Sequence, residues 1–162
     1  MKKLIAIFFV AGMGIIMLNA CRKEKSDDTD GLLHNEIIES GYVYFQNGNL
    51  LSSAAPSPHG SFKLRFNPIA FAALDSTGRL PKGSRFPDGS ILVKEVYEGG
   101  AIKLSVVMKK DPSNKNQESD WLWAEFAING SPLYSVQKKG QDCIGCHRGG
   151  LSRDLIRTFD LH

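Results

Sequence analysis

Cysteine is scarce in this chain, and its scarcity limits how the protein can be stabilised. Three cysteines occur among 162 residues, at Cys21, Cys143 and Cys146. A framework of several disulfides, which holds many small secreted domains together, is therefore excluded. Each of the three thiols also lies in a motif with a use of its own, so none is left over for a disulfide.

The chain also lacks a large excess of either basic or acidic residues. The chain has 20 basic and 17 acidic residues and a formal net charge of +3. Such a balance creates no strong field, so we expect neither a nucleic-acid partner nor electrostatic attraction to an acidic membrane surface. The apolar stretch 4–18 is shorter than the roughly 20 residues that a membrane-spanning helix needs.

The amino end carries the features of an export signal. Two lysines precede the apolar stretch, and small residues followed by Cys21 close it. This order is typical of a signal peptide, and the cysteine at the boundary resembles a bacterial lipobox. We predict a lipoprotein signal peptide over 1–20 and a lipid on Cys21.

The residues after Cys21 indicate a flexible connection to a single domain. The run 22–30 is charged and has no apolar side chain, which predicts a tether over 21–31. The remaining residues, 32–162, are enough for one domain. We expect this domain in the bacterial cell envelope, lipid-anchored, in the periplasm or at the outer membrane.

The most informative motif lies near the carboxyl end. Cys143 and Cys146 stand three positions apart, and His147 follows directly. Two thiols at this spacing reach the two vinyl groups of one haem, and the adjacent imidazole ligates the iron. A redox dithiol would need a βαβ context, and a zinc site would need further ligands at regular spacing. The motif therefore predicts one covalently bound haem c with His147 as the proximal iron ligand.

Alternation of apolar and polar residues predicts the strands. It indicates strands over 61–66, 91–97, 102–108 and 121–128, with a hairpin at Gly99-Gly100. Helical patterns predict helices over 32–40, 67–74 and 131–140, a helical turn capped by Asp142 at the haem cysteines, and a short tail over 149–162. Consecutive strands in a meander predict an α+β fold: one β-rich domain with an antiparallel sheet and a few short helices.

The sequence offers no evident second axial ligand for the iron. Met108 is the sole methionine outside the predicted signal peptide, and it lies on the apolar side of a predicted strand, where packing is its expected role. His59 lies in a loop between Pro58 and Gly60, where we expect a surface or structural role. We therefore predict an iron with an open sixth position, which binds or transforms a small molecule.

Lys94 is the second residue of interest. It alternates with Leu92 and Val96, so it shares a strand face with apolar neighbours. A lysine in such a place must extend to water or meet a partner. One interpretation is an edge-strand lysine that prevents aggregation; the other is a partner inside the domain.

Four segments of the chain, taken in order, resemble the cytochrome P460 family. They are Asn67-Pro68-Ile69-Ala70, the stretch 86–95, Asp120-Trp121-Leu122-Trp123 and the terminal haem motif. The resemblance covers about Ser61 to Arg148, whereas the amino-terminal part and the long connector depart from the family pattern. It implies a β-rich c-haem domain, usually a homodimer, with a five-coordinate iron.

The resemblance also implies roles for particular residues. In hydroxylamine-oxidising members a lysine is bonded to a meso carbon of the haem, and the matching lysine here is Lys94. In the related beta-type cytochromes c-prime, which bind nitric oxide, an aromatic residue caps the distal face. Phe86 is the candidate for such a cap, with core packing as the alternative. Glu95 and Glu125 are candidates for a distal proton-handling group, although Glu95 should face away from Lys94 because adjacent strand residues point to opposite sides.

Three functions remain open. The protein oxidises hydroxylamine or a related nitrogen oxide and passes electrons to a periplasmic acceptor, or it binds nitric oxide, or it is an electron-transfer lipoprotein with a low-spin iron. The missing sixth ligand favours a site for a small gaseous or nitrogenous ligand. The sequence does not separate the first two functions.

Overall fold

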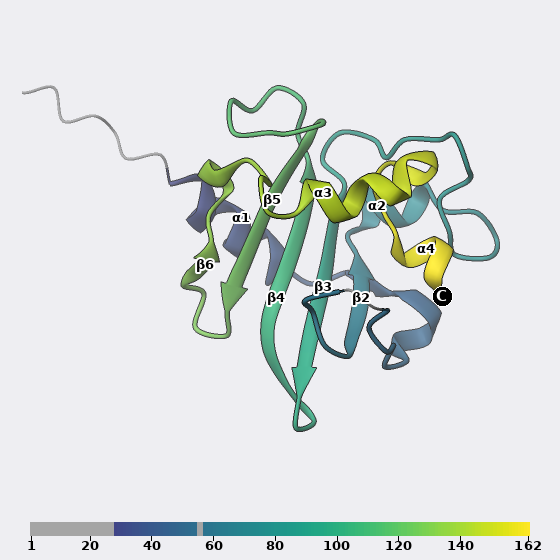
Figure 1. Ribbon diagram of the computed structural model, residues 1–162, viewed down its shortest axis with the longest axis horizontal. Coiled ribbons are helices and arrows are strands. Elements are labelled where there is room, and N and C mark those ends of the chain that lie inside the picture. The colour runs from purple at the N-terminus through teal and green to yellow at the C-terminus, as the bar shows by residue number, and fades with distance from the viewer. Residues whose placement is uncertain (1–27, 55–56) are drawn as a thin grey trace, which may run out of the picture.

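An antiparallel sheet forms the body of the protein (Figure 1). The computed structural model describes residues 28–54 and 57–162. The six strands of the described sheet lie side by side in sequence order: β1 (Val43–Tyr44), β2 (Phe62–Phe66), β3 (Ile91–Glu98), β4 (Ala101–Lys110), β5 (Trp121–Ala127) and β6 (Pro132–Tyr134). Every neighbouring pair is antiparallel, which confirms the predicted β-rich α+β meander.

Strands β2 to β5 form where the alternation of the sequence predicts them. In β2, three buried residues alternate with two half-buried ones. The turn between β3 and β4 is the predicted hairpin, because Gly99 and Gly100 take φ values of 60° and 85° that suit glycine, and Glu98 pairs with Ala101 across it.

The amino-terminal helix begins earlier than predicted. Helix α1 spans Thr29–Ile37, so it starts inside the stretch expected to be a tether. The Asp30 carboxylate accepts hydrogen bonds from the Ser135 hydroxyl at 2.6 Å and the Val136 amide at 2.9 Å. These contacts are more than a hundred residues apart in sequence, so local composition does not reveal them. The second helix, α2 (Pro68–Ala72), is as predicted, with the Asn67 side chain accepting from the Ala70 amide.

The helix predicted over 131–140 is wrong. The chain there forms β6, followed by η2, a 3₁₀ turn over Val136–Lys138. Asn129-Gly130 makes the tight turn that returns the chain beside β5, with Gly130 at a φ of 84°. Pro132 is tolerated because β6 is an edge strand of the sheet.

The sheet buries a different apolar cluster on each face. One face packs on α1. The cluster there contains Leu33 and Ile37 from α1, Val136 from η2, and from the sheet Ile91, Val93, Val107, Leu122, Ala124 and Phe126. The opposite face carries the larger, aromatic-rich cluster, with Phe62, Phe66, Trp121 and Trp123 from the sheet. Figure 1 shows α1 and the C-terminal helices on opposite sides of the strands.

The C-terminal segment, residues 144–162, is part of the fold, including the stretch 149–162 that is expected to be a short tail. It forms α3 (Ile144–His147), the 3₁₀ stretch η3 (Arg148–Arg153) and α4 (Thr158–Leu161). Leu155, Ile156 and Phe159 are buried in the aromatic-rich cluster. The predicted Asp142 cap is not formed: Cys143 is the residue before α3, and no side chain caps that end.

The predicted signal peptide and the lipid on Cys21 lie outside the described residues. None of the described helices is long and apolar enough to cross a membrane.

Candidate functional site

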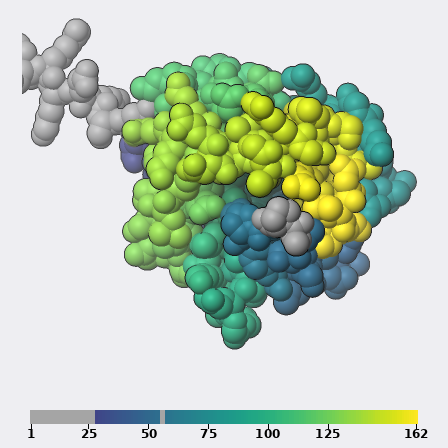
Figure 2. Space-filling model, viewed as in Figure 1, coloured from purple at the N-terminus to yellow at the C-terminus, as the bar shows by residue number. Residues whose placement is uncertain are grey.

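A cavity of about 320 Å³ lies between the aromatic-rich face of the sheet and the C-terminal segment. Its floor comes from β2 to β6, and its walls come from loop residues 57–59 and from α3 to α4. Figure 2 views the molecule from this side, where the C-terminal segment covers the sheet. All three residues of the predicted haem motif, Cys143, Cys146 and His147, line the cavity, and so does Lys94.

The two thiols fit covalent attachment better than redox exchange. Both are free; Cys143 is half-buried and Cys146 is exposed. Burial raises the pKa of the Cys143 thiol to about 11, whereas a reactive dithiol needs a lowered pKa. Among the described residues, no group of three or more His, Cys, Asp and Glu side chains is arranged to hold a metal ion. Gly145, between the thiols, has open space around it.

His147 is held as a neutral imidazole with one nitrogen engaged. Its Nδ1 atom lies 2.9 Å from the carbonyl oxygen of Leu155, and its ring meets the Trp123 ring edge-on, with centroids 4.9 Å apart. Burial lowers the pKa of His147 to about 4. With Nδ1–H donating to a carbonyl, Nε2 keeps its lone pair, which is the arrangement of a metal-ligating histidine.

Lys94 points into the cavity from the middle of the sheet. Leu64, Lys94, Val106 and Glu125 are cross-strand partners in one row, and all four line the cavity. β3 lies between β2 and β4, so the edge-strand interpretation of Lys94 is wrong. Its Nζ atom lies 4.3 Å from the centre of the Phe62 ring. Burial, with a contribution from the nearby Arg157 cation, lowers the pKa of Lys94 to about 8.

Two further titratable groups share the cavity. His59 Nδ1 lies 3.9 Å from Glu125 Oε1. Burial lowers the pKa of His59 to about 4, with Lys94 and His147 adding to the effect, and burial raises the pKa of Glu125. His59, expected at the surface or in a structural role, therefore lies on the cavity wall. Its position depends on how the loop 57–60 folds, and no local sequence signal gives that.

Glu95 and Phe86 lie away from the cavity. The Glu95 carboxylate faces the other side of the sheet, where it pairs with Arg65 at 2.7 Å and accepts from the Tyr44 hydroxyl. Phe86 is 2 % exposed and packs against Trp121 and Phe159. Phe86 therefore has the core-packing role, and the aromatic ring on the cavity wall beside Lys94 is that of Phe62.

Met108 has the packing role expected from the sequence. It is 6 % exposed within the aromatic-rich cluster, as expected for packing, and it also lines the cavity. It pairs across the sheet with Trp123, the residue that contacts the His147 ring.

Comparison with known proteins adds one finding. The family model described as Cytochrome P460 matches residues 45–158, more than half of the chain. No curated protein matches the chain.

Proposed function

The chain belongs to the cytochrome P460 family, and on that premise we propose that it is an exported mono-haem c-type cytochrome that oxidises hydroxylamine or a related small nitrogen species. The family implies a haem c cytochrome and includes hydroxylamine-oxidising members. One observation carries the proposal for this chain: Lys94 and the Cys143–His147 motif, far apart in sequence, line the same cavity.

The motif residues would hold the cofactor. The Cys143 and Cys146 thiols would each add across one vinyl group of the haem, which gives two thioethers and no leaving group. His147 presents Nε2 because Leu155 accepts from Nδ1. When bound, the haem supplies a redox-active iron whose potential the protein tunes through the axial ligand and the surroundings.

Lys94 would tune the cofactor. Its lowered pKa increases the fraction of neutral, nucleophilic amine near neutral pH. A bond from Nζ to a porphyrin meso carbon would replace one N–H and one C–H bond, and an oxidant such as a peroxide would take up the two electrons and two protons. Such a bond would distort the macrocycle and change its electronics.

Glu125 and His59 would manage the protons. Oxidation of hydroxylamine releases protons together with electrons. The raised pKa of Glu125 makes its carboxylate a better base than an exposed one, and His59 is close enough to relay a proton through one water. The electrons pass to a periplasmic acceptor. We infer that Cys21 carries the lipid that keeps the protein in the cell envelope, and that the protein is a homodimer as its family implies.

Nitric oxide binding is the second candidate. The apolar cavity wall of Phe62, Leu64 and Val106 suits a small uncharged ligand. This function needs no bond to Lys94, so the presence or absence of that bond distinguishes the two candidates.

The test is the spectrum of the full chain produced with working haem-attachment machinery. We expect a high-spin, five-coordinate ferric iron and turnover of hydroxylamine with an artificial electron acceptor. A low-spin spectrum would instead implicate Met108 or His59 as a sixth ligand and leave electron transfer as the function. Nitric oxide binding without turnover would favour the second candidate, and a colourless protein would refute all three functions.

A further inference from the structure

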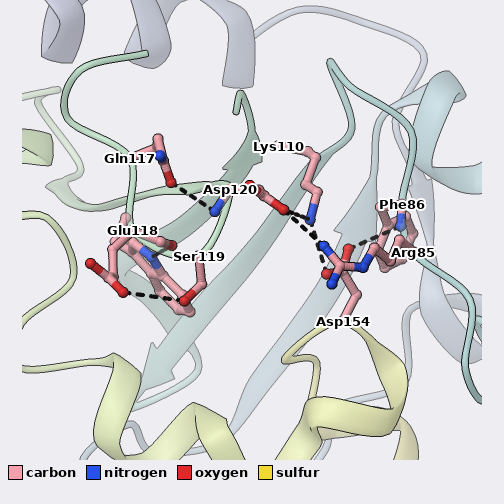
Figure 3. A network of polar contacts seen from close by, with 9 residues as sticks. Arg85, Phe86, Lys110, Gln117, Glu118, Ser119, Asp120 and Asp154 are labelled. Atoms are coloured by element: carbon pink, nitrogen blue, oxygen red, sulfur yellow. Dashed lines mark hydrogen bonds and ion pairs between the residues drawn. The ribbon is translucent and has the colours of Figure 1, made fainter. Parts of the chain in front are cut away.

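A buried ion pair joins Lys110 of the sheet to Asp154 of the C-terminal segment (Figure 3). Lys110, at the end of β4, is 3 % exposed, and its Nζ atom lies 2.9 Å from Oδ1 of Asp154, which is 8 % exposed. Nζ also lies 3.5 Å from Oδ2 of Asp120 and 4.9 Å from the centre of the Trp121 ring. Lysine is almost never this buried unless it is paired, so the pair fixes the C-terminal segment to the sheet.

The aspartate of this pair begins an unusual turn. Asp154 has a φ of 52° and Leu155 a φ of 73°. Two successive non-glycine residues in this region are unfavourable, and the penalty is largest for a residue such as leucine. The turn therefore needs external support. Asp154 Oδ2 accepts from the Phe86 amide at 3.0 Å while Oδ1 receives Lys110, and the Leu155 amide donates to the Gly150 carbonyl at 2.8 Å.

The end of this turn touches the motif. The carbonyl oxygen of Leu155 itself accepts a hydrogen bond from His147 Nδ1–H at 2.9 Å. We propose that Lys110 and Asp154 are positioning residues for His147: their buried pair holds the left-handed turn that aims the Leu155 carbonyl at the imidazole. This inference rests on the proposed function, because it assigns His147 as the proximal iron ligand.

The pair then acts on the iron through the ligand. A carbonyl that accepts from Nδ1–H increases the basicity of the imidazole and fixes its orientation. Without the pair the turn relaxes toward ordinary φ values, the carbonyl leaves the ring, and the ligand becomes a weaker donor. The bond between iron and His147 weakens, and the reduced iron becomes relatively more stable.

The experiment measures the iron–histidine stretching band of the ferrous protein by resonance Raman and the midpoint potential by redox titration. The main variant is Lys110→Met with Asp154→Asn, because replacing both members of a buried pair is tolerated better than removing one. We expect the band to move to lower frequency and the midpoint potential to rise. The second variant, Asp154→Glu, keeps both charges, but its extra methylene displaces the carboxylate from Phe86, so the same shifts should appear.

The matched control is Lys109→Met with Glu36→Gln. Lys109 is the neighbour of Lys110 on β4 and faces the other side of the sheet, where its Nζ atom lies 2.7 Å from Oε1 of Glu36 in α1. The control should leave both readouts unchanged. Unshifted readouts in haem-loaded Lys110 and Asp154 variants overturn the inference, and so does failure of both to fold, since the pair would then determine the fold and not the ligand. Wild-type protein without haem refutes the proposed function instead.

Discussion

Lys94 and Glu95 are neighbours in the chain and face opposite sides of the sheet. Lys94 lines the cavity, whereas Glu95 is 5 % exposed on the other face and pairs with Arg65 at 2.7 Å. The alternation of a strand therefore separates a lysine and a carboxylate that would otherwise neutralise one another. Burial, with a contribution from the Arg157 cation, therefore keeps the pKa of Lys94 low.

The first prediction concerns Lys94. Lys94→Arg removes the nucleophilic amine, because a guanidinium stays protonated at all accessible pH values. If Lys94 is bonded to the haem, the variant shows an ordinary c-haem spectrum, and peptide mapping no longer finds the Lys94 peptide attached to the haem peptide. Lys63→Arg, on the adjacent strand and the opposite face, should leave both unchanged. An identical spectrum in wild type and Lys94→Arg would mean that no such bond exists.

The second prediction concerns the Arg65–Glu95 pair. Arg65→Met leaves a buried carboxylate without its cation and should lower the free energy of unfolding by about 3–5 kcal/mol. The double variant Arg65→Met/Glu95→Gln should recover most of that loss, since no buried charge remains unpaired. Urea unfolding of wild type, both single variants and the double variant gives the coupling energy. A coupling energy near zero would contradict the burial of this pair.

The third prediction concerns Gly140. It has a φ of 62°, and a methyl group there would lie 2.5 Å from Cδ1 of Trp123. Gly99 has nearly the same φ, 60°, but open space around it. Gly99→Ala should therefore lower the free energy of unfolding by about 1 kcal/mol, because alanine must adopt the left-handed backbone. Gly140→Ala should cost about 1–3 kcal/mol more for the collision. Thermal unfolding of the two variants side by side measures the difference, and equal losses would place the Trp123 ring elsewhere.

The fourth prediction concerns pH and His59. Burial lowers the pKa of His59 from 6.5 to about 4 in the folded protein. Between pH 6.5 and pH 4 the His59 side chain binds more protons in the unfolded chain than in the folded protein. The contribution of this site to the free energy of unfolding is therefore complete above about pH 6.5, and it is lost as the pH falls toward 4. At about 1.4 kcal/mol per pKa unit, the loss is at most about 3 kcal/mol.

Comparison of wild type with His59→Asn isolates that contribution. The raised pKa of Glu125 has the opposite sign, because the folded protein then holds its proton more tightly than the unfolded chain. Urea unfolding of both proteins from about pH 7 to about pH 4 should give a flatter dependence in the variant. Parallel curves would show that His59 titrates normally in the folded state.

The central part of the fold follows from local sequence patterns. The strands β2 to β5, the Gly99-Gly100 hairpin and the Asn67 cap are fixed by alternation, turn residues and capping chemistry within a few positions. The same is true of the haem motif, where spacing alone indicates the cofactor.

The remainder depends on contacts that are distant in sequence. β5 is buried on both faces, with Leu122, Ala124 and Phe126 on one and Trp121 and Trp123 on the other. Its alternation therefore does not indicate which face carries the site, and only the cross-strand rows show that Glu125, and not the other candidate Glu95, lines the cavity. The C-terminal segment has no regular apolar period because it packs through single residues such as Phe159. Lys110 and Asp154 are 44 positions apart, so neither reveals the other.

The order of the strands and the haem motif along the chain has a consequence for how the protein is assembled. The six described strands end by Tyr134, whereas Cys143, Cys146, His147 and the Leu155 carbonyl that accepts from it all come afterwards. A chain synthesised as far as Tyr134 contains every described strand, while Trp121, Trp123 and Phe66 still lack the segment that covers them. Until residues 143–159 fold against it, this apolar face has no cover, so the haem attachment that we propose at Cys143 and Cys146 takes place on the same segment that closes the core.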